Sequence, residues 1–224
     1  RVRSLSVLYK GDGAVGGTLT ARGISFLVKE GRTNIDAPDL LTRVFGFYEK
    51  LPEVRQVEYV RKIYPDRVEV KLDLREPFVR IRDVYFDREG CRLSRKFNQA
   101  VSAEPIPAVQ GLRYPRGLEA GDVWENIYFK EVLKALEAVE SKLAVQNVII
   151  PRSGRPTHAQ GIILQTQEGA SVYWGSVFQQ GTDVGISVDK KIRNLNNALR
   201  IIARNMDRVD YADISRDKPV IAYK

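Results

Sequence analysis

The stretch that decides the fold is LPEVRQVEYVRKIYPDRVEVKLDLREP, residues 51–77. Apolar and charged residues alternate in its second half, where the apolar set is Val68, Val70, Leu72 and Leu74. A period of two predicts a strand with one buried face and one solvated face. The upstream run VEYVRKIYP predicts a partner strand, and Pro65-Asp66 supplies turn residues between the two runs. The stretch therefore predicts a β-hairpin.

A helix is predicted directly before this hairpin. Apolar residues recur at helical spacing between residues 40 and 48, with Pro38 near the start and Asp36 as the expected cap. Further upstream, residues 2–9 predict a strand, and the glycine-rich run at 10–18 predicts a loop.

Residues 19–31 then predict a short helix that is interrupted or kinked at Gly23. Together with the strand, helix and hairpin around them, these residues give the order β-α-α-β-β for residues 1–75.

The step Arg75-Glu76-Pro77 predicts a domain boundary, because proline favours extended geometry before it and cannot donate to a central ladder. In the second domain, residues 78–93 predict two strands around a turn at residues 87–90, and residues 106–112 predict a proline-fixed extended segment. The elements predicted after these are a helix at 128–143, a strand at 144–150, a hairpin at 161–174, a helix from Asp189, and strands at 209–215 and 218–223. The sequence thus predicts a two-domain α+β protein, with residues 1–75 and 76–224 as its domains.

Several of these stretches resemble one known family. NIDAPDLLTRVF, residues 34–45, followed by residues 51–77 resembles the end of a POTRA domain: a helix, a P-x-V strand entry, a second strand and a closing R-E-P. The pattern is most similar to the FtsQ/DivIB proteins of the bacterial division machinery. Weaker motifs continue the resemblance in the same order, namely IPAVQGL, VYWG and VDYADISRDKPVIAYK. Asp213 stands in the place of the family's aspartate, but Ser215 occupies the usual position of its arginine and Arg216 follows one residue later.

The resemblance implies a POTRA domain at 1–75 and an FtsQ-type β domain at 76–224, β-rich with packed helices. It also implies a non-enzymatic scaffold of the divisome that links division proteins across the inner membrane. A single transmembrane helix before Arg1 would anchor the chain in the cell inner membrane, with residues 1–224 on the periplasmic or extracellular side. The implied partners are FtsB, FtsL and the FtsW/FtsI pair.

Two other classes of function stay open. POTRA domains also occur in components of outer-membrane protein assembly and polypeptide transport. A basic nucleic-acid-binding protein is the second alternative, because 36 Lys and Arg against 28 Asp and Glu give a net charge of +8. That class requires exposed aromatic residues among the basic ones, and Trp124 and Trp174 stand in apolar or turn contexts instead.

The residue pattern does not favour catalysis. His158, the only histidine, lies in a polar, loop-like run, and Cys91 follows a predicted turn without an evident activating neighbour. Asp210 and Asp213 are three residues apart in a predicted strand, so their side chains point to opposite faces. Metal-ligand spacing is absent from the sequence. We therefore expect no enzymatic activity, no cofactor and no metal.

The partner-binding site is predicted on the terminal hairpin, residues 209–223, because a strand that ends a domain is expected at a sheet edge. Lys218 and Pro219 would protect the start of that edge strand against unspecific pairing with other chains. The predicted contact residues are Tyr211, Asp213, Ser215, Arg216, Val220, Ile221 and Tyr223, together with Arg193, Arg200 and Arg204 on the last helix. Those arginines and Lys190 form a basic helix face, which is either a solvated surface or a docking surface for an acidic segment or lipid headgroups.

Overall fold

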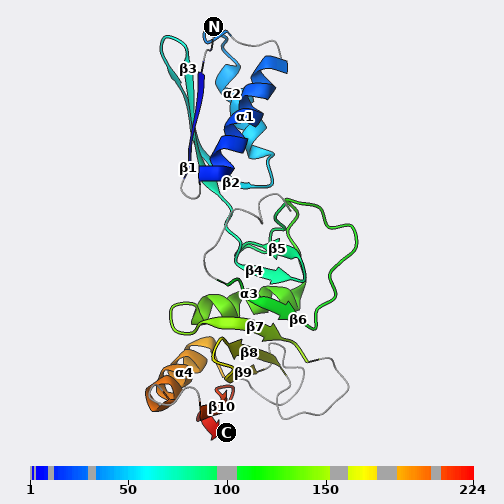
Figure 1. Cartoon of the computed structure of the whole chain (residues 1–224), viewed down its shortest axis with the longest axis vertical. Coiled ribbons are helices and arrows are strands. Elements are labelled where there is room, and N and C mark those ends of the chain that lie inside the picture. Colours follow the sequence, from blue (N-terminus) through cyan, green and yellow to red (C-terminus); the bar gives the residue numbers. More distant parts are fainter. Residues whose placement is uncertain are drawn as a thin grey trace. The chain divides into compact units, whose positions relative to one another are not determined.

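The computed structural model describes residues 2, 4–9, 13–29, 34–94, 105–151, 161–175, 186–202 and 208–224. Within these residues the fold is mixed α+β, with four helices and two sheets (Figure 1). The chain divides into two compact units. The first contains Arg1–Pro77, Cys91–Ala103 and Leu118–Asp122, and the second contains Phe78–Gly90, Glu104–Gly117 and Val123–Lys224.

The first unit has the element order predicted from the sequence. Its elements are β1 (Ser4–Tyr9), α1 (Gly13–Lys29), α2 (Leu40–Glu49), β2 (Val54–Ile63) and β3 (Arg67–Leu74). The sheet order is β1-β3-β2, with β1 parallel and β2 antiparallel to the central strand. Both helices lie along the same side of this sheet in Figure 1. The predicted β2–β3 hairpin is confirmed, and the alternating residues Val68, Val70, Leu72 and Leu74 are all buried.

The prediction for α1 was wrong in two respects. The helix begins at Gly13, inside the glycine-rich run predicted as a loop, and it continues through Gly23 without interruption. A Cβ at Gly23 would collide with the Tyr48 hydroxyl and with Leu5, so the missing side chain makes room for α2 and β1. The Tyr48 hydroxyl donates to the Leu19 carbonyl in this contact, at 3.1 Å. Close packing therefore offsets the low helix propensity of glycine.

The cap predicted for α2 was also wrong. Asp39 is the N-cap residue and makes no side-chain cap bond, while the Asp36 backbone N–H donates to Asn34 Oδ1. The Asp39 carboxylate instead pairs with Arg43 one turn later, at 2.8 Å. The buried face of α2 consists of Leu40, Val44 and Tyr48.

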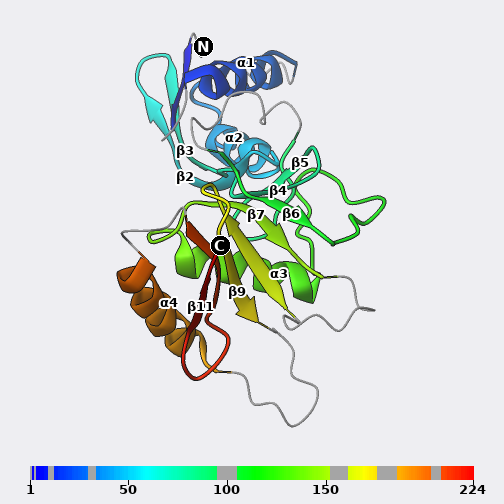
Figure 2. The same cartoon turned by 60° about the horizontal axis from the view of Figure 1, so that its bottom comes forward.

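The second unit is built on an eight-stranded sheet of order β11-β10-β9-β8-β7-β6-β4-β5. Its elements are β4 (Val79–Ile81), β5 (Val84–Phe86), β6 (Ala108–Gln110), α3 (Ile127–Val139), β7 (Val145–Ile149), β8 (Ile162–Thr166), β9 (Ser171–Gly175), α4 (Val188–Ile202), β10 (Val209–Asp213) and β11 (Val220–Tyr223). In Figure 2, α3 lies behind the sheet and α4 lies beside the end that carries β11. The helices, strands and hairpins predicted between residues 106 and 223 are confirmed in order and approximate extent.

The first hairpin of this unit turns earlier than predicted. Arg82 and Asp83 form the turn between β4 and β5, and Arg82 has a positive φ of 56°. The predicted turn at residues 87–90 exists but follows β5, where the Glu89 N–H donates to Asp87 Oδ1. Phe86 is fully buried and stacks edge to face on Phe129, with ring centroids 4.9 Å apart. Its burial holds residue 86 within a strand rather than at the start of a turn.

The two faces of the large sheet differ in burial. Leu164, Val172 and Trp174 are buried on one face, while the alternate residues Ile163 and Tyr173 on the other face are half-buried. The buried face is the one that α3 and α4 cover. The contact between Trp174 and Lys191 of α4 shows this, with Lys191 Nζ 5.3 Å from the indole centroid.

We expect Gly23→Ala to destabilise the first unit by about 2 kcal/mol, because the added Cβ meets the Tyr48 hydroxyl and Leu5 in a closely packed region. Urea unfolding followed by circular dichroism would measure the change. Gly46→Ala is the matched control, since nothing lies within 4 Å of a Cβ at that helical position. This control should be neutral or stabilising by up to about 1 kcal/mol. Equal urea midpoints of unfolding for Gly23→Ala and Gly46→Ala would show that close packing at Gly23 does not limit stability.

Candidate partner-binding site

β11 is an edge strand, as predicted. Within the described residues, β10 is the neighbouring strand on one side and no strand lies on the other. The Lys224 N–H donates to the Arg208 carbonyl at 2.8 Å, and Tyr223 pairs with Val209. Backbone groups alternate in direction along an antiparallel strand, so the N–H groups of Tyr223 and Ile221 point away from β10. These two residues therefore present the outward row of donors and acceptors.

The predicted aromatic anchors lie on opposite faces of the sheet. Tyr211 pairs with Ala222 and lies beside Tyr173 on the half-buried face, with the two rings edge to face and their centroids 5.1 Å apart. Tyr223 is two residues from Ile221, which packs on the helix-covered side against the cluster of Ala170 and Val209. Alternate residues share a face, so Tyr223 belongs to that side. Tyr223 lies on the edge strand itself, whereas Tyr211 lies one strand further in, on β10.

Two apolar side chains of β11 are exposed to solvent. Tyr223 is 53% exposed and Val220 is 43% exposed, which is high for large apolar residues in a strand. Val220 pairs with Asp213 and so lies on the same side as Tyr211. Each face of the sheet therefore offers one exposed apolar side chain next to the unpaired backbone.

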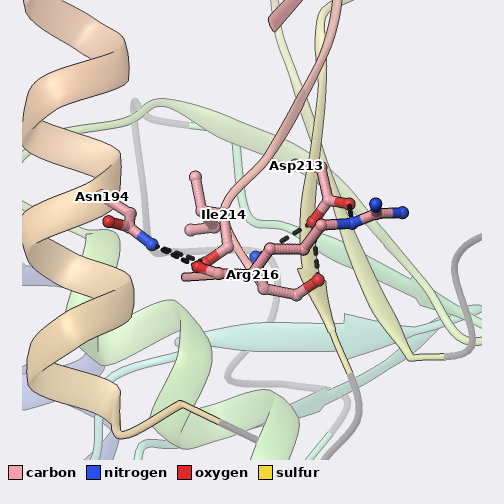
Figure 3. Close-up of polar contacts among 5 residues, drawn as sticks. Asn194, Asp213, Ile214 and Arg216 are labelled. Carbon is pink, nitrogen blue, oxygen red and sulfur yellow. Dashed lines mark hydrogen bonds and ion pairs between the residues drawn. The ribbon is translucent and has the colours of Figure 1, made fainter. Parts of the chain in front are cut away.

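Ser215 and Arg216 both bond to Asp213 at the start of the connection between β10 and β11, where Figure 3 shows Asp213 and Arg216. Asp213 is buried, and its Oδ1 accepts from the Ser215 N–H at 3.0 Å and from the Ser215 hydroxyl at 2.6 Å. Its Oδ2 accepts from Arg216 Nε at 2.8 Å. Both carboxylate oxygens are thus engaged within the connection, which they hold as a compact turn.

Asn194 on α4 holds the same connection from the other side, and the sequence analysis did not identify it. Its amide nitrogen donates to the Arg216 carbonyl at 2.7 Å and to the Ile214 carbonyl at 3.3 Å. Figure 3 shows this side chain reaching from the helix to the connection. Asn194 is 5% exposed and lies next to the buried Leu195. An asparagine within an apolar helical stripe was the signal that could have found it, because a buried amide needs hydrogen-bond partners.

The structure describes three of the four residues predicted for the basic face of α4. Arg193 and Arg200 are exposed, but Lys190 forms an ion pair with Asp217 of the β10–β11 connection. Arg204 lies outside the described residues. Lys191 is buried over Trp174, and this burial lowers the pKa of its ammonium group. Two arginines of α4 are therefore placed on its exposed surface within the part of the chain that the structure describes.

The residues weighed as catalytic candidates do not assemble into a site in the described part of the chain. Cys91 is buried and its thiol donates to the Gly121 carbonyl at 3.2 Å, while His158 lies outside the described residues. Asp210 is exposed and Asp213 is buried, and a β-bulge between Val209 and Tyr211 interrupts the alternation on which the prediction of opposite faces relied. Within the described ranges, no group of three or more His, Cys, Asp or Glu side chains is placed to hold a metal ion. The absence of activity stays a prediction.

Comparisons with known proteins do not identify a family for this chain. No protein-family model matches it, and no curated protein is significantly similar to it in sequence.

Among the described residues, no helix combines the length and apolar character needed to cross a membrane. Trp124 and Trp174, the two tryptophans considered for nucleic-acid stacking, are both buried.

We expect Asp213→Ala to lower the free energy of unfolding of the second unit by about 2 kcal/mol, since it leaves the Ser215 N–H and the Arg216 guanidinium without their acceptor. Thermal unfolding monitored by circular dichroism would test this. Asp210→Ala removes an exposed carboxylate from the same strand and should change stability by less than about 0.5 kcal/mol. A loss of the same size in both variants would indicate a general effect of charge instead.

Proposed function

We propose that this chain is the extracytoplasmic part of an FtsQ-type scaffold, which receives a partner by strand addition at β11. The observation that carries this proposal is the edge position of β11 at the end of the sheet, with outward backbone groups at Ile221 and Tyr223. An added strand would gain main-chain hydrogen bonds from this row, and its side chains would alternate between the two faces. The function is binding and scaffolding rather than catalysis.

The first unit supports the same proposal. Its order β-α-α-β-β and its mixed three-stranded sheet agree with a POTRA domain. The helix, hairpin and closing Arg75-Glu76-Pro77 are the segments whose sequence resembles that domain. In the proposed whole protein, a transmembrane helix before Arg1 anchors the chain in the inner membrane. FtsB and FtsL then bind on the periplasmic or extracellular side, with the FtsW/FtsI pair in the same assembly.

The specificity for a partner would come from side chains on both faces of the sheet next to β11. Tyr223 and Val220 offer exposed apolar contacts on opposite sides, and Lys218 with Pro219 limits pairing at the entry to the strand. Arg193 and Arg200 on the neighbouring helix would attract acidic residues of the partner. We therefore propose an extended partner segment with alternating apolar residues and acidic residues near its ends.

Ile221→Pro should abolish capture of FtsB from the same organism, because proline removes an N–H group that points away from β10. Isothermal titration calorimetry with the extracytoplasmic segment of FtsB would measure the loss. Ile221→Ala is the matched control: it gives up the apolar contact with the core but keeps the backbone donor, so capture should persist. Circular dichroism would verify that both variants remain folded.

Tyr223→Ala tests the side-chain part of the same site. It removes a half-exposed ring and should weaken FtsB binding by about tenfold while leaving the unfolding midpoint nearly unchanged. Unchanged capture by both Ile221→Pro and Tyr223→Ala would rule out the edge-strand site. Failure of the unaltered chain to bind FtsB would overturn the proposed function itself.

A further inference from the structure

β11 is the strand at the edge of the described sheet. It is four residues long, and within the described residues it pairs with β10 alone. A strand that is hydrogen-bonded on one side opens more readily than the inner strands of a sheet. The residues that join β10 to β11 therefore help to fix the conformation of β11 in the free protein.

This connection is held by three elements. The Ile214 N–H donates to the Tyr173 carbonyl of β9 at 3.2 Å, and a Cβ at Gly175 would collide with the Ser215 side chain. Asp213 of β10 fixes the turn from within, through its bonds to Ser215 and Arg216. The third element is α4, which reaches the connection through Asn194.

Asn194 is the only side chain from α4 that is hydrogen-bonded to the backbone of this connection among the contacts described, and it binds two carbonyls at once. Ile214 is fully buried, so its carbonyl would have no access to bulk water if it lost the bond from Asn194. Lys190, one helical turn before Asn194, adds an exposed ion pair to Asp217. Exposed pairs of this kind contribute little, so the buried amide is the stronger of these two polar restraints from the helix.

We propose that Asn194 is a positioning residue that holds β11 ready for strand addition by tying the β10–β11 connection to α4. This inference rests on the proposed function, because β11 must be the strand that receives the partner. A preordered edge lowers the entropy lost when the partner strand binds, so Asn194 raises affinity without contacting the partner. Its effect on binding passes through the connection at residues 214–217.

Asn194→Asp tests the inference most directly. The side chain keeps its size, but the introduced carboxylate cannot donate and faces two carbonyl oxygens. Asn197→Asp makes the same charge change at an exposed position of the same helix and serves as the matched control. Both variants are made in the 224-residue chain, and Asn194→Ala replaces the first variant if it does not fold.

Amide hydrogen exchange of the free protein gives the first readout. We expect exchange in residues 214–223 to accelerate about tenfold in Asn194→Asp, while strands β7 to β9 and all of Asn197→Asp exchange as in the unaltered chain. A purely structural role would instead accelerate exchange throughout the second unit. Unchanged exchange at 214–223, or acceleration spread evenly over the unit, would overturn the inference.

Affinity for the soluble FtsB–FtsL complex of the same organism gives the second readout. We expect Asn194→Asp to bind about tenfold more weakly and Asn197→Asp to bind normally. Equal affinity for all three chains would overturn the positioning role but leave the proposed function intact. If the unaltered chain does not bind the complex, the proposed function fails, and the exchange experiment then decides alone whether Asn194 orders β11.

Discussion

Within the described residues, the outer side of β11 has no strand beside it, and this open edge is the constraint from which the proposed binding follows. Backbone N–H and C=O groups form obligatory hydrogen bonds, and an inner strand such as β10 satisfies them on both sides. β11 satisfies its backbone groups on the side towards β10, whereas the backbone N–H and C=O groups of Ile221 and Tyr223 point outward. An edge of this kind pairs with other chains unless it is short, charged or occupied. The short length of β11 and its approach through Lys218 and Pro219 limit that tendency without removing it.

The distribution of charge bears on which partner such an edge attracts. In the first unit, the solvated face of the sheet is largely paired, through Arg61 with Glu69, Lys71 with Glu58, and Arg55 with Asp73. Paired charges of this kind leave little net field at that surface. In the second unit, the cations beside the edge strand include Arg193 and Arg200 on α4. The first sheet therefore contributes little to the net charge of +8. The described basic residues near β11 favour a partner segment that carries acidic residues.

Periodic patterns in the sequence predicted most of the fold. Local signals gave the turns at Pro65-Asp66 and Glu168-Gly169 correctly, but they misplaced the start of α1, the cap of α2 and the turn between β4 and β5. The β2–β3 hairpin and α3 were predicted well because burial requires an uninterrupted period of two or 3.6. Gly23 misled the prediction towards a kink, since the close approach of Tyr48 to Gly23 is a tertiary contact that no local propensity contains. The turn at Arg82 was missed for a similar reason. Its position follows from the burial of Phe86 among aromatic rings rather than from the turn residues at 87–90.

The predicted binding residues separate into two physical roles once their contacts are known. Tyr223 and Val220 are exposed beside the open edge, so they are placed to touch an added strand. Asp213 is buried, and both of its carboxylate oxygens accept bonds from Ser215 and Arg216. A carboxylate that is buried and engaged in this way is not placed to contact an added strand.

The same contacts show how three neighbouring residues close the turn after β10. Ser215 donates to Oδ1 of Asp213 through its hydroxyl and its backbone N–H. Arg216, one residue later, still reaches Oδ2 at 2.8 Å because the chain curves around the aspartate. Arg216 therefore completes the bonds that Asp213 accepts within the turn. A partner added at β11, as we propose, would be recognised by the backbone of β11 and by the side chains along it.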